Sequence, residues 1–284
     1  MQQLESQESQ NKSTSEYIHG FTKTEQERLV RQSRFIEPYI YPTIDFAQCN
    51  HILEIGCGVG AQIEILLRKY PNLRITGVDR SKEQIQRATE FLKPYYIDDA
   101  QRVFLHLEDG GNLPFANDTF DGCFICFVLE HTEDPIAILQ EVRRVIQPGS
   151  RLYCSEVFHR SLYIYPSCPL TELYWQNLNE YQKELKGDPE VGIKLCNLAL
   201  KVEFSDVTIR DFCIHLDARN QNLKERELFF DYWIDLCLSV APSLCERDKI
   251  TLDLLDGMKA ELHSLKSNPD CIFSYTGKQL EAVK

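Results

Sequence analysis

The sequence lacks several features that mark common classes of protein. It has no run of lysine and arginine, and its formal net charge is -12 over 284 residues. Because an acidic surface repels a phosphate backbone, we expect no nucleic-acid partner. It also has no stretch of about eighteen apolar residues and no apolar run after a basic region near its start. We therefore expect a cytoplasmic protein with no secretory signal and no membrane partner.

Cysteine is plentiful, but its pattern indicates neither disulfides nor a metal. The eleven cysteines are scattered through segments with strand and helix patterns, and a cytoplasmic compartment is reducing. Cys123 and Cys126 form a C-x-x-C pattern, yet no second pair and no histidine pair follows at the spacing of metal ligands. We predict buried, reduced cysteines and no metal.

Residues 46–158 alternate short apolar runs with helical patterns. The runs HILEIG, RITGVD and FDGCFICFVL predict strands, and segments such as SKEQIQRATEFL predict helices of ten or more residues. This alternation is typical of βαβ units and of a parallel sheet covered by helices on both faces. We predict an α/β fold with a Rossmann-like, doubly wound, mostly parallel seven-stranded sheet.

The chain before this core divides into two regions. Residues 1–15 are rich in Gln, Ser, Asn and Glu, which predicts a disordered tail. Residues 16–45 predict a helical lid. Thr22 and Glu25 form a capping-box pattern at its start, and two prolines, Pro38 and Pro42, should end the helix.

Residues 159–284 predict a helical, aromatic-rich cap together with the last strands of the sheet. Leu170 to Glu184 and Arg226 to Ser239 have helical patterns. The run VEFSDVTIRDFCIHL predicts one strand, and CIFSYT predicts a last strand at the edge of the sheet.

The sharpest local signal is a glycine-rich loop in the stretch EIGCGVG, between a predicted strand and a predicted helix. Gly56, Gly58 and Gly60 allow a tight turn and let backbone N–H groups approach a ligand beside a helix N-terminus. Nineteen residues after Gly60, Asp79 ends the next predicted strand, where a carboxylate accepts hydrogen bonds from ribose hydroxyls. These features predict an adenosine-containing cofactor and fit NAD as well.

Two further motifs separate these alternatives. Glu108-Asp109-Gly110 precedes Leu113-Pro114-Phe115, and a segment from Phe127 to His131 follows the fourth predicted strand, ahead of Asp134-Pro135. In this order and spacing, the motifs resemble those of class I methyltransferases with a type 11 methyltransferase domain, over about residues 50 to 155. The resemblance implies S-adenosyl-L-methionine as cofactor and methyl transfer as activity.

The resemblance also implies where the cofactor lies. The methionine end would lie against the Gly56 to Gly60 loop and the ribose on Asp79, with Asp109 facing the adenine amine and Phe127 near the sulfonium. The cofactor-binding residues that we expect are Glu54, Gly56, Cys57, Gly58, Gly60, Gln62, Asp79, Arg80, Asp109, Gly110, Phe127, Val128 and His131.

Two segments resemble a narrower group, the small-molecule methyltransferases of natural-product and secondary metabolism. They are Tyr17-Ile-His19-Gly20 and the stretch from Glu156 to Ser161. Because ligands bind at the carboxyl ends of parallel strands, His159 and Glu156 are catalytic candidates, as is His19 in the lid. Each has a structural alternative: a turn cap for Glu156, a solvated loop position for His159 and a packed helix lead-in for His19.

The acceptor is expected to be an aromatic or apolar small molecule. Aromatic residues gather after residue 158 and either form core or line the acceptor pocket. We assign Tyr17, Tyr163, Tyr165 and Trp175 to the substrate. Further aromatics with the same two readings are Tyr174, Tyr181, Phe229, Phe230, Tyr232 and Trp233. The last four also predict, as an alternative, the surface of a homo-oligomer.

Two functions from other classes stay open on the sequence. An NAD(P)-dependent oxidoreductase shares the glycine-rich loop and Asp79, but it would need a proton donor such as a Tyr/Lys pair, and none follows the fourth predicted strand. A non-catalytic cofactor-binding subunit would keep the loop and lack an acceptor pocket. The aromatic cap argues against the second alternative.

Overall fold

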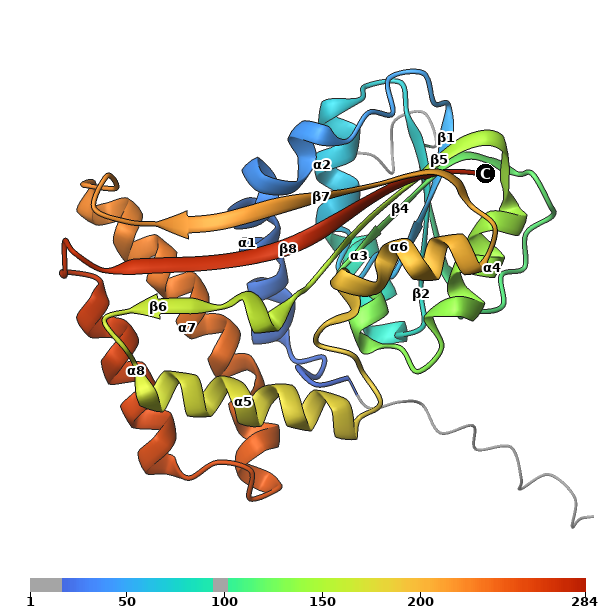
Figure 1. The fold of residues 1–284 in the computed structure, drawn as a ribbon. Coiled ribbons are helices and arrows are strands. Elements are labelled where there is room, and N and C mark those ends of the chain that lie inside the picture. The colour runs from blue at the N-terminus through green and yellow to red at the C-terminus, as the bar shows by residue number, and fades with distance from the viewer. Residues whose placement is uncertain (1–16, 94–101) are drawn as a thin grey trace, which may run out of the picture.

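The structure, a computed structural model, describes residues 17–93 and 102–284. Within these ranges the chain forms one mixed sheet of eight strands, one more than predicted, flanked by helices (Figure 1). The strands are β1 His51–Ile55, β2 Arg74–Asp79, β3 Val103–Leu107, β4 Phe120–Cys126, β5 Ile146–Glu156, β6 Tyr163–Tyr165, β7 Ser205–Leu216 and β8 Ile272–Val283. The α-helices are α1 Lys23–Ile40, α2 Ala61–Lys69, α3 Lys82–Leu92, α4 Pro135–Val145, α5 Pro169–Glu184, α6 Val191–Lys201, α7 Leu223–Glu246 and α8 Leu252–Leu265.

The first five strands confirm the predicted doubly wound core. They are parallel and lie in the order β3-β2-β1-β4-β5, so the winding reverses between β1 and β4. Glu54 on β1 lies beside Gly77 on β2 and Phe124 on β4. Because all five strands run the same way, their carboxyl ends meet at one edge of the sheet, the edge where open α/β sheets bind ligands.

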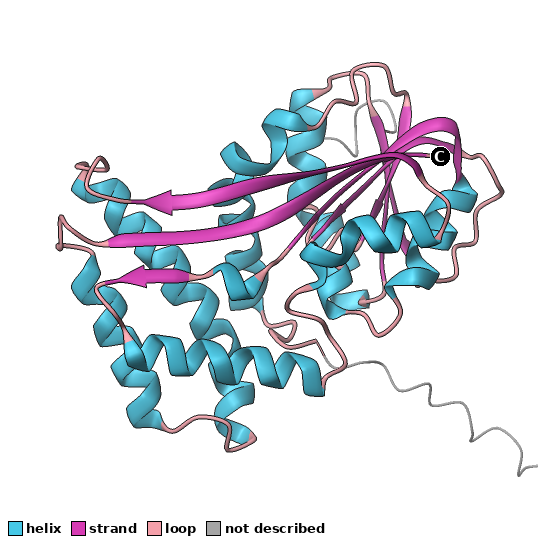
Figure 2. Ribbon diagram, viewed as in Figure 1, coloured by secondary structure: helices cyan, strands magenta, loops and turns pink. Residues whose placement is uncertain are grey.

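Helices cover both faces of this core, as predicted. On one face α2 contributes Leu66 and α3 contributes Leu92 to a buried cluster that also holds Ile36 of α1. On the other face α4 and α6 bury Val142 and Leu195. Figure 2 shows the helices on the two sides of the strands. Burial on both faces explains why the strand sequences are almost continuously apolar.

The last strand differs from its prediction. CIFSYT lies at the start of β8, which is twice as long as that segment and pairs antiparallel with β5, β6 and β7. It is therefore an inner strand rather than the predicted edge strand. The sequence pattern hid this length, because residues 277–281 are mostly polar and break the apolar run.

The predicted helical cap consists of α5, α7 and α8, with β6 and the outer halves of β7 and β8 beside them (Figure 1). The sequence predicted α5 and part of α7 but missed α6, α8 and β6. Within the described ranges, α7 alone has the length and mean hydropathy, 1.3, of a membrane span, and 44% of that window is buried. Its buried residues include Phe230 and Trp233, which pack in the cap core.

The predicted lid contains α1, which begins where the capping pattern placed it. Thr22 Oγ1 accepts a hydrogen bond from the N–H of Glu25 at 3.2 Å. Pro38 does not end the helix, contrary to prediction, and α1 continues to Ile40 before a 3-10 turn that contains Pro42. Ile36 and Ile40 are fully buried, and the burial of each side chain stabilises the fold by about 1.5–3 kcal/mol. The predicted tail, residues 1–15, lies outside the described residues.

The cysteines were predicted to be buried, but not all of them are. All eleven are free; seven are buried and Cys213 is exposed. Cys123 and Cys126 are both buried in β4. Among the described residues, no group of three or more His, Cys, Asp or Glu side chains is arranged to hold a metal ion.

Candidate functional site

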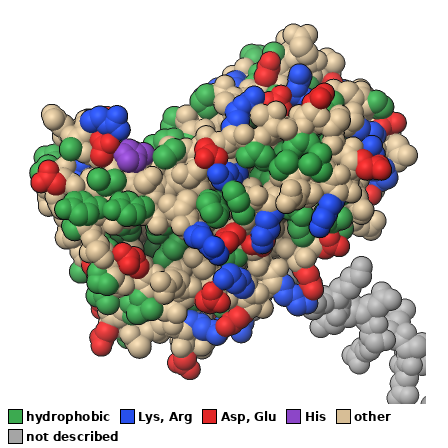
Figure 3. Space-filling view, in the orientation of Figure 1, with side chains coloured by type: hydrophobic (Ala, Val, Ile, Leu, Met, Phe, Trp, Pro, Cys, Tyr) green, Lys and Arg blue, Asp and Glu red, His purple; other side chains and the backbone are tan. Residues whose placement is uncertain are grey.

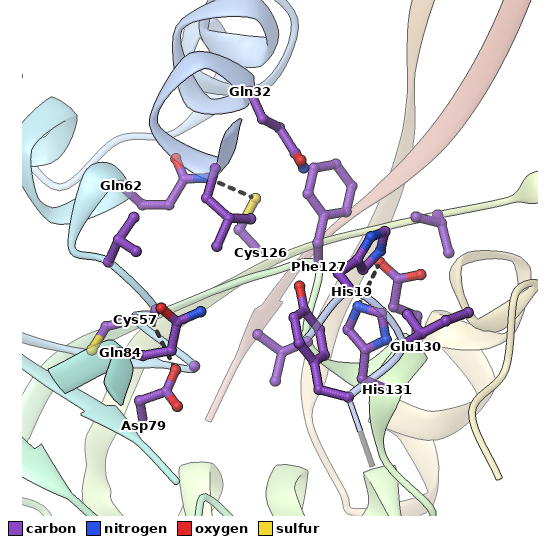
Figure 4. A pocket seen from close by; sticks show the side chains of 18 of the residues that line it. His19, Gln32, Cys57, Gln62, Asp79, Gln84, Cys126, Phe127, Glu130 and His131 are labelled. Atoms are coloured by element: carbon purple, nitrogen blue, oxygen red, sulfur yellow. Dashed lines mark hydrogen bonds and ion pairs between the residues drawn. The ribbon is translucent and has the colours of Figure 1, made fainter. Parts of the chain in front are cut away.

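The carboxyl ends of β1, β2 and β4 open into a cavity of about 230 Å³. One end is lined by the glycine-rich loop and Asp79 (Figure 4), and side chains of the cap line the other. The segment from Tyr17 to Phe21, ahead of α1, lines a third side. The cavity thus joins the core, the lid and the cap.

The glycine-rich loop has the conformation for which glycine is required. Gly56, Gly58 and Gly60 have φ values of +65°, +50° and +79°, in the left-handed region. A Cβ atom on Gly56 would lie 2.5 Å from Val128 Cγ2, so the loop also needs a small residue there to pack against the loop after β4. The turn leads directly into α2, and the first two residues of this helix, Ala61 and Gln62, line the cavity.

Asp79 stands at the end of β2 with its carboxylate fixed by backbone groups. Its Oδ2 accepts from the N–H of Gly58 at 2.9 Å, and its Oδ1 accepts from the N–H of Ser81 at 2.8 Å. Burial raises the pKa of Asp79 above its usual value, and the two N–H donors oppose that shift. Each carboxylate oxygen retains a lone pair for a ligand hydroxyl.

Glu54 lies beneath the loop rather than on the cavity surface. It is 1% exposed and is absent from the residues that line the cavity. Burial, with the nearby Asp79 carboxylate, raises its pKa well above the usual range. Gly60 also lies outside the lining, between the lining residues Val59 and Ala61. Neither expected contact therefore lies on the cavity surface, and Gly60 contributes its left-handed turn to the loop.

The remaining expected cofactor residues line the cavity. Phe127 follows β4 in a left-handed conformation, φ +57°, held by its N–H, which donates to the Ser155 carbonyl at 2.9 Å. Asp109 lies after β3, where its Oδ1 accepts from the N–H of Gly111. The other expected residues in the lining are Cys57, Gln62, Arg80, Gly110, Val128 and His131.

Glu156 does not have the catalytic position that the sequence predicted. It ends β5 in full burial, and its Oε1 accepts from the N–H groups of Val128 and Leu129 at 2.9 and 2.7 Å. Burial and the neighbouring Glu130 raise its pKa to about 8. It does not line the cavity. Glu156 is therefore a positioning residue that holds the loop after β4.

His159 lines the cavity on a short 3-10 turn after β5. Its Nδ1 is 3.1 Å from the hydroxyl of Tyr275, and its Nε2 is 3.8 Å from Glu130 Oε2. Burial lowers its pKa to about 4, so the ring is neutral at pH 7. A neutral ring beside a carboxylate can accept a proton, and the carboxylate then stabilises the charged form.

His19 also lines the cavity and ties the lid to the cap. Its Nδ1 is 2.6 Å from Ser239 Oγ on α7. Its ring lies 6.0 Å from that of His131, and the ring of Tyr17 meets His131 edge-on at 4.9 Å. Burial lowers the pKa of His19. The segment before α1 is therefore attached to both walls of the cavity.

The expected substrate residues divide into two pairs. Tyr17 and Trp175 line the cavity, and the Trp175 indole N–H donates to the His159 carbonyl at 3.0 Å. Tyr163 and Tyr165 do not line it: both lie on β6 and are 58% and 51% exposed. Since side chains alternate across a strand, burying Ile164 turns both tyrosines outward. In Figure 3, hydrophobic side chains gather at the left edge, over β6.

Several lining residues escaped the sequence analysis. Glu130 lies in the quoted segment after β4, but its role depends on Gln182, whose amide N–H donates to Glu130 Oε2 at 2.8 Å. Arg28 and Gln32 were hidden in the amphipathic pattern of α1. Other residues in this group come from distant parts of the cap: Leu178, Ile214, Leu236 and Tyr275. Tyr232 and Trp233 also line the cavity, and the sequence had left them open between core and pocket. Tyr232 and Trp233 carried a signal, the aromatic stretch at α7.

The lining fits an adenosine ligand and a second, less polar molecule. Gln84 Oε1, buried near Asp79, has no hydrogen-bond partner among the described residues, and adenosine offers several donors. At the cap end, buried Trp233 Nε1 likewise lacks a partner among them. The aromatic walls there are Trp175, Trp233, Tyr232 and Tyr275. The ring centroids of Trp233 and Tyr275 lie 5.2 Å apart.

Comparison with protein families supports this assignment of the core. Residues 53–154 match the family model of the methyltransferase domain. Methyltransferase GfsG of Streptomyces halstedii is 30% identical over 43% of this chain and 42% of its own length. O-methyltransferase resE of Aspergillus sclerotiorum is 29% identical over 62% and 65%. The chain thus spans less than two thirds of the length of these relatives.

A solved structure shows the same fold over nearly the whole chain. Phosphoethanolamine N-methyltransferase 2 of Haemonchus contortus, in complex with S-adenosyl-L-methionine, matches with a TM-score of 0.57 at 17% identity. The match covers 93% of this chain and 57% of that one. The likeness therefore includes the elements of the cap as well as the core.

Proposed function

We propose that this chain, which carries a class I, S-adenosyl-L-methionine-dependent methyltransferase domain, transfers a methyl group from that cofactor to a small aromatic or apolar acceptor. The observation that carries the proposal is one continuous cavity. It runs from the glycine-rich loop and Asp79 to the aromatic walls around Trp175 and Trp233. A non-catalytic subunit would have no use for the second end.

The residues at the cofactor end fit an adenosine that carries a methionine. Asp79 has lone pairs for the ribose hydroxyls, and Asp109 and Gly110 line the slot expected for adenine. Phe127 offers an aromatic face to a positive sulfur. S-Adenosyl-L-methionine, when bound, supplies a methyl carbon that its positive sulfur activates toward displacement.

The protein aligns the cofactor and the acceptor, encloses them away from water, and accepts a proton where the acceptor must lose one. The lid segment, held to α7 by His19 and Ser239, excludes water from the cavity. Alignment converts a bimolecular step into an effectively unimolecular one. If the acceptor atom carries a proton, neutral His159 is placed to take it, because Glu130 and the Tyr275 hydroxyl stabilise the resulting cation.

The names of the similar proteins leave the acceptor atom open. The name of resE denotes transfer to oxygen and that of the Haemonchus enzyme transfer to nitrogen. The cap end combines aromatic walls with the polar pair Glu130 and His159, which suits a flat apolar body bearing one hydroxyl or amine.

Isothermal titration with S-adenosyl-L-methionine and S-adenosylhomocysteine tests the cofactor, with NAD(P)H as competitor ligand. We expect binding of the first two and none of the third. An acceptor panel of phenols, indoles and aromatic amines then follows, with mass spectrometry detecting the gain of one CH₂ unit. Binding of NAD(P)H alone would sink the proposal. Cofactor binding without transfer to any acceptor would favour the non-catalytic alternative.

A further inference from the structure

The inner face of α1 carries a buried ion pair beside the cavity. Glu25 is 3% and Arg28 5% exposed, and Arg28 donates from Nε and Nη2 to the two carboxylate oxygens of Glu25, at 2.7 Å each. The free energy lost by removing two charges from water is about as large as the attraction between them. Apolar residues of similar volume therefore often stabilise such a site equally well. Packing alone therefore does not account for these two side chains.

Arg28 keeps hydrogen-bonding capacity after this pairing. A guanidinium group has five N–H donors. Two are directed at Glu25, and one on Nη1 is directed at Gln32 Oε1. Among the described residues, one N–H on each terminal nitrogen has no partner. Two N–H groups on neighbouring nitrogens match the two oxygens of a carboxylate.

Permanent positive charge is scarce in the cavity. Within the described lining the permanently charged cations are Arg28 and Arg80. Burial lowers the pKa of the three lining histidines, so they contribute little charge at pH 7; they are His19, His131 and His159. Arg80 directly follows Asp79, at the ribose end.

Arg28 lies on a different wall, one helical turn from Gln32 on α1. Figure 4 shows Gln32 reaching from α1 toward Phe127, whereas Asp79 lies at the other end of the view. Arg28 and Asp79 both line the cavity, Arg28 from α1 and Asp79 from the end of β2. A ligand with its ribose on Asp79 and its charged end on α1 would extend from one of these walls to the other.

We propose that Arg28 binds the carboxylate at the methionyl end of the cofactor and that Glu25 is the positioning residue that fixes the guanidinium plane. This role rests on the function proposed above. The amino-acid end of S-adenosyl-L-methionine carries a carboxylate, whereas its adenosine end carries no charge. Arg28 therefore recognises the part of the cofactor that NAD lacks, and it does so from the lid.

Titration with two ligands separates this contact from the rest of the site. S-Adenosylhomocysteine has the amino-acid end, and 5′-methylthioadenosine has the same adenosine and sulfur without it. In Arg28→Gln we expect the affinity for S-adenosylhomocysteine to fall about tenfold or more. The affinity for methylthioadenosine should stay within about twofold of the wild type, because that ligand has no carboxylate.

Two further variants keep the test decisive. Arg28→Gln leaves the Glu25 carboxylate buried without a partner, so the double variant Glu25→Gln/Arg28→Gln removes both charges and should show the same selective loss. The matched control is Arg31→Gln on the same helix. Arg31 is exposed and pairs with Asp235, so neither ligand should bind differently.

Two results would overturn the assignment. An equal loss of both ligands in the double variant would give Arg28 a structural role, and full retention of S-adenosylhomocysteine binding would remove any role in the contact. A wild-type chain that binds neither ligand would instead refute the proposed function itself. Asp79→Ala marks the shared part of the site, since it should weaken both ligands together.

Discussion

The cofactor end and the acceptor end of the cavity are built in different ways. At the cofactor end, backbone groups of Gly58 and Ser81 fix the Asp79 carboxylate, and short loops after β1, β2, β3 and β4 supply the rest. At the acceptor end, side chains from the lid, α5, α7 and β8 meet. The first end depends on local chain geometry, and the second on the packing of distant elements.

This difference predicts that the two ends respond separately to substitution. The largest effect should come from Asp79→Ala, which removes charge-assisted bonds to the ribose. We expect S-adenosylhomocysteine to bind about 1.5–3 kcal/mol more weakly, measured by isothermal titration. Asp211→Ala on exposed β7 is the matched control and should bind normally. An unchanged affinity in Asp79→Ala would remove Asp79 from the ribose site.

The next effect concerns pH and belongs to the acceptor end. Burial holds the pKa of His159 at about 4, below the value of about 6.5 for an unfolded chain. The unfolded state therefore takes up this proton first as the pH falls, and folding stability is lost between pH 6.5 and 4. In His159→Gln, the loss between pH 7 and pH 5 should be about 2 kcal/mol smaller.

Denaturant unfolding at the two pH values measures this difference. The control is His263→Gln, because His263 is exposed on α8 and its replacement should leave the pH dependence of the wild type. An identical pH dependence in wild type and His159→Gln would show that His159 is already charged at pH 5. Its pKa would then lie near that of the unfolded chain, and burial would not set its protonation state.

A smaller effect is expected from Trp175→Phe. The change keeps an aromatic wall but removes the hydrogen bond from the indole N–H to the His159 carbonyl, worth about 1 kcal/mol of stability. The KM for the acceptor should rise while the affinity for S-adenosylhomocysteine stays unchanged. An equal fall in cofactor affinity would show that the two ends are coupled, against the comparison drawn above.

The smallest effect should come from Tyr163→Ser and Tyr165→Ser. Both side chains are more than half exposed on β6, away from the cavity. Stability should change by no more than about 0.5 kcal/mol, and the KM for the acceptor should not change. A raised KM in either variant would return these tyrosines to the substrate site, where the sequence had placed them.

The same comparison explains what the sequence could and could not predict. Gly56, Asp79 and Phe127 occupy fixed places relative to strands that alternate regularly with helices, so their convergence at one sheet edge follows from topology. The core strands and α1 to α4 were predicted for the same reason. A short apolar run between helical patterns has few other interpretations in a chain of this composition.

The acceptor end escaped prediction because its contacts are tertiary. Tyr163 and Trp175 carry the same aromatic signal, yet one faces outward on a three-residue strand and the other lines the cavity. Glu156 stands at the end of a core strand, a position typical of catalytic residues. Its carboxylate nevertheless accepts hydrogen bonds from the backbone of the loop after β4. Nothing in residue type or spacing distinguishes these outcomes before the fold is known.

Strand β8 gives the molecule an order of assembly. Its pairing joins Arg151 to Val283, whereas β1 and β2 pair between residues 51 and 78. Closing a longer loop loses more chain entropy before stabilising contacts can form. Pairings between strands close in sequence therefore form earlier. Tyr275, the partner of His159, reaches its place only with that late pairing. A chain emerging from the ribosome should therefore complete its cofactor end first and gain its acceptor end only when β8 has been synthesised.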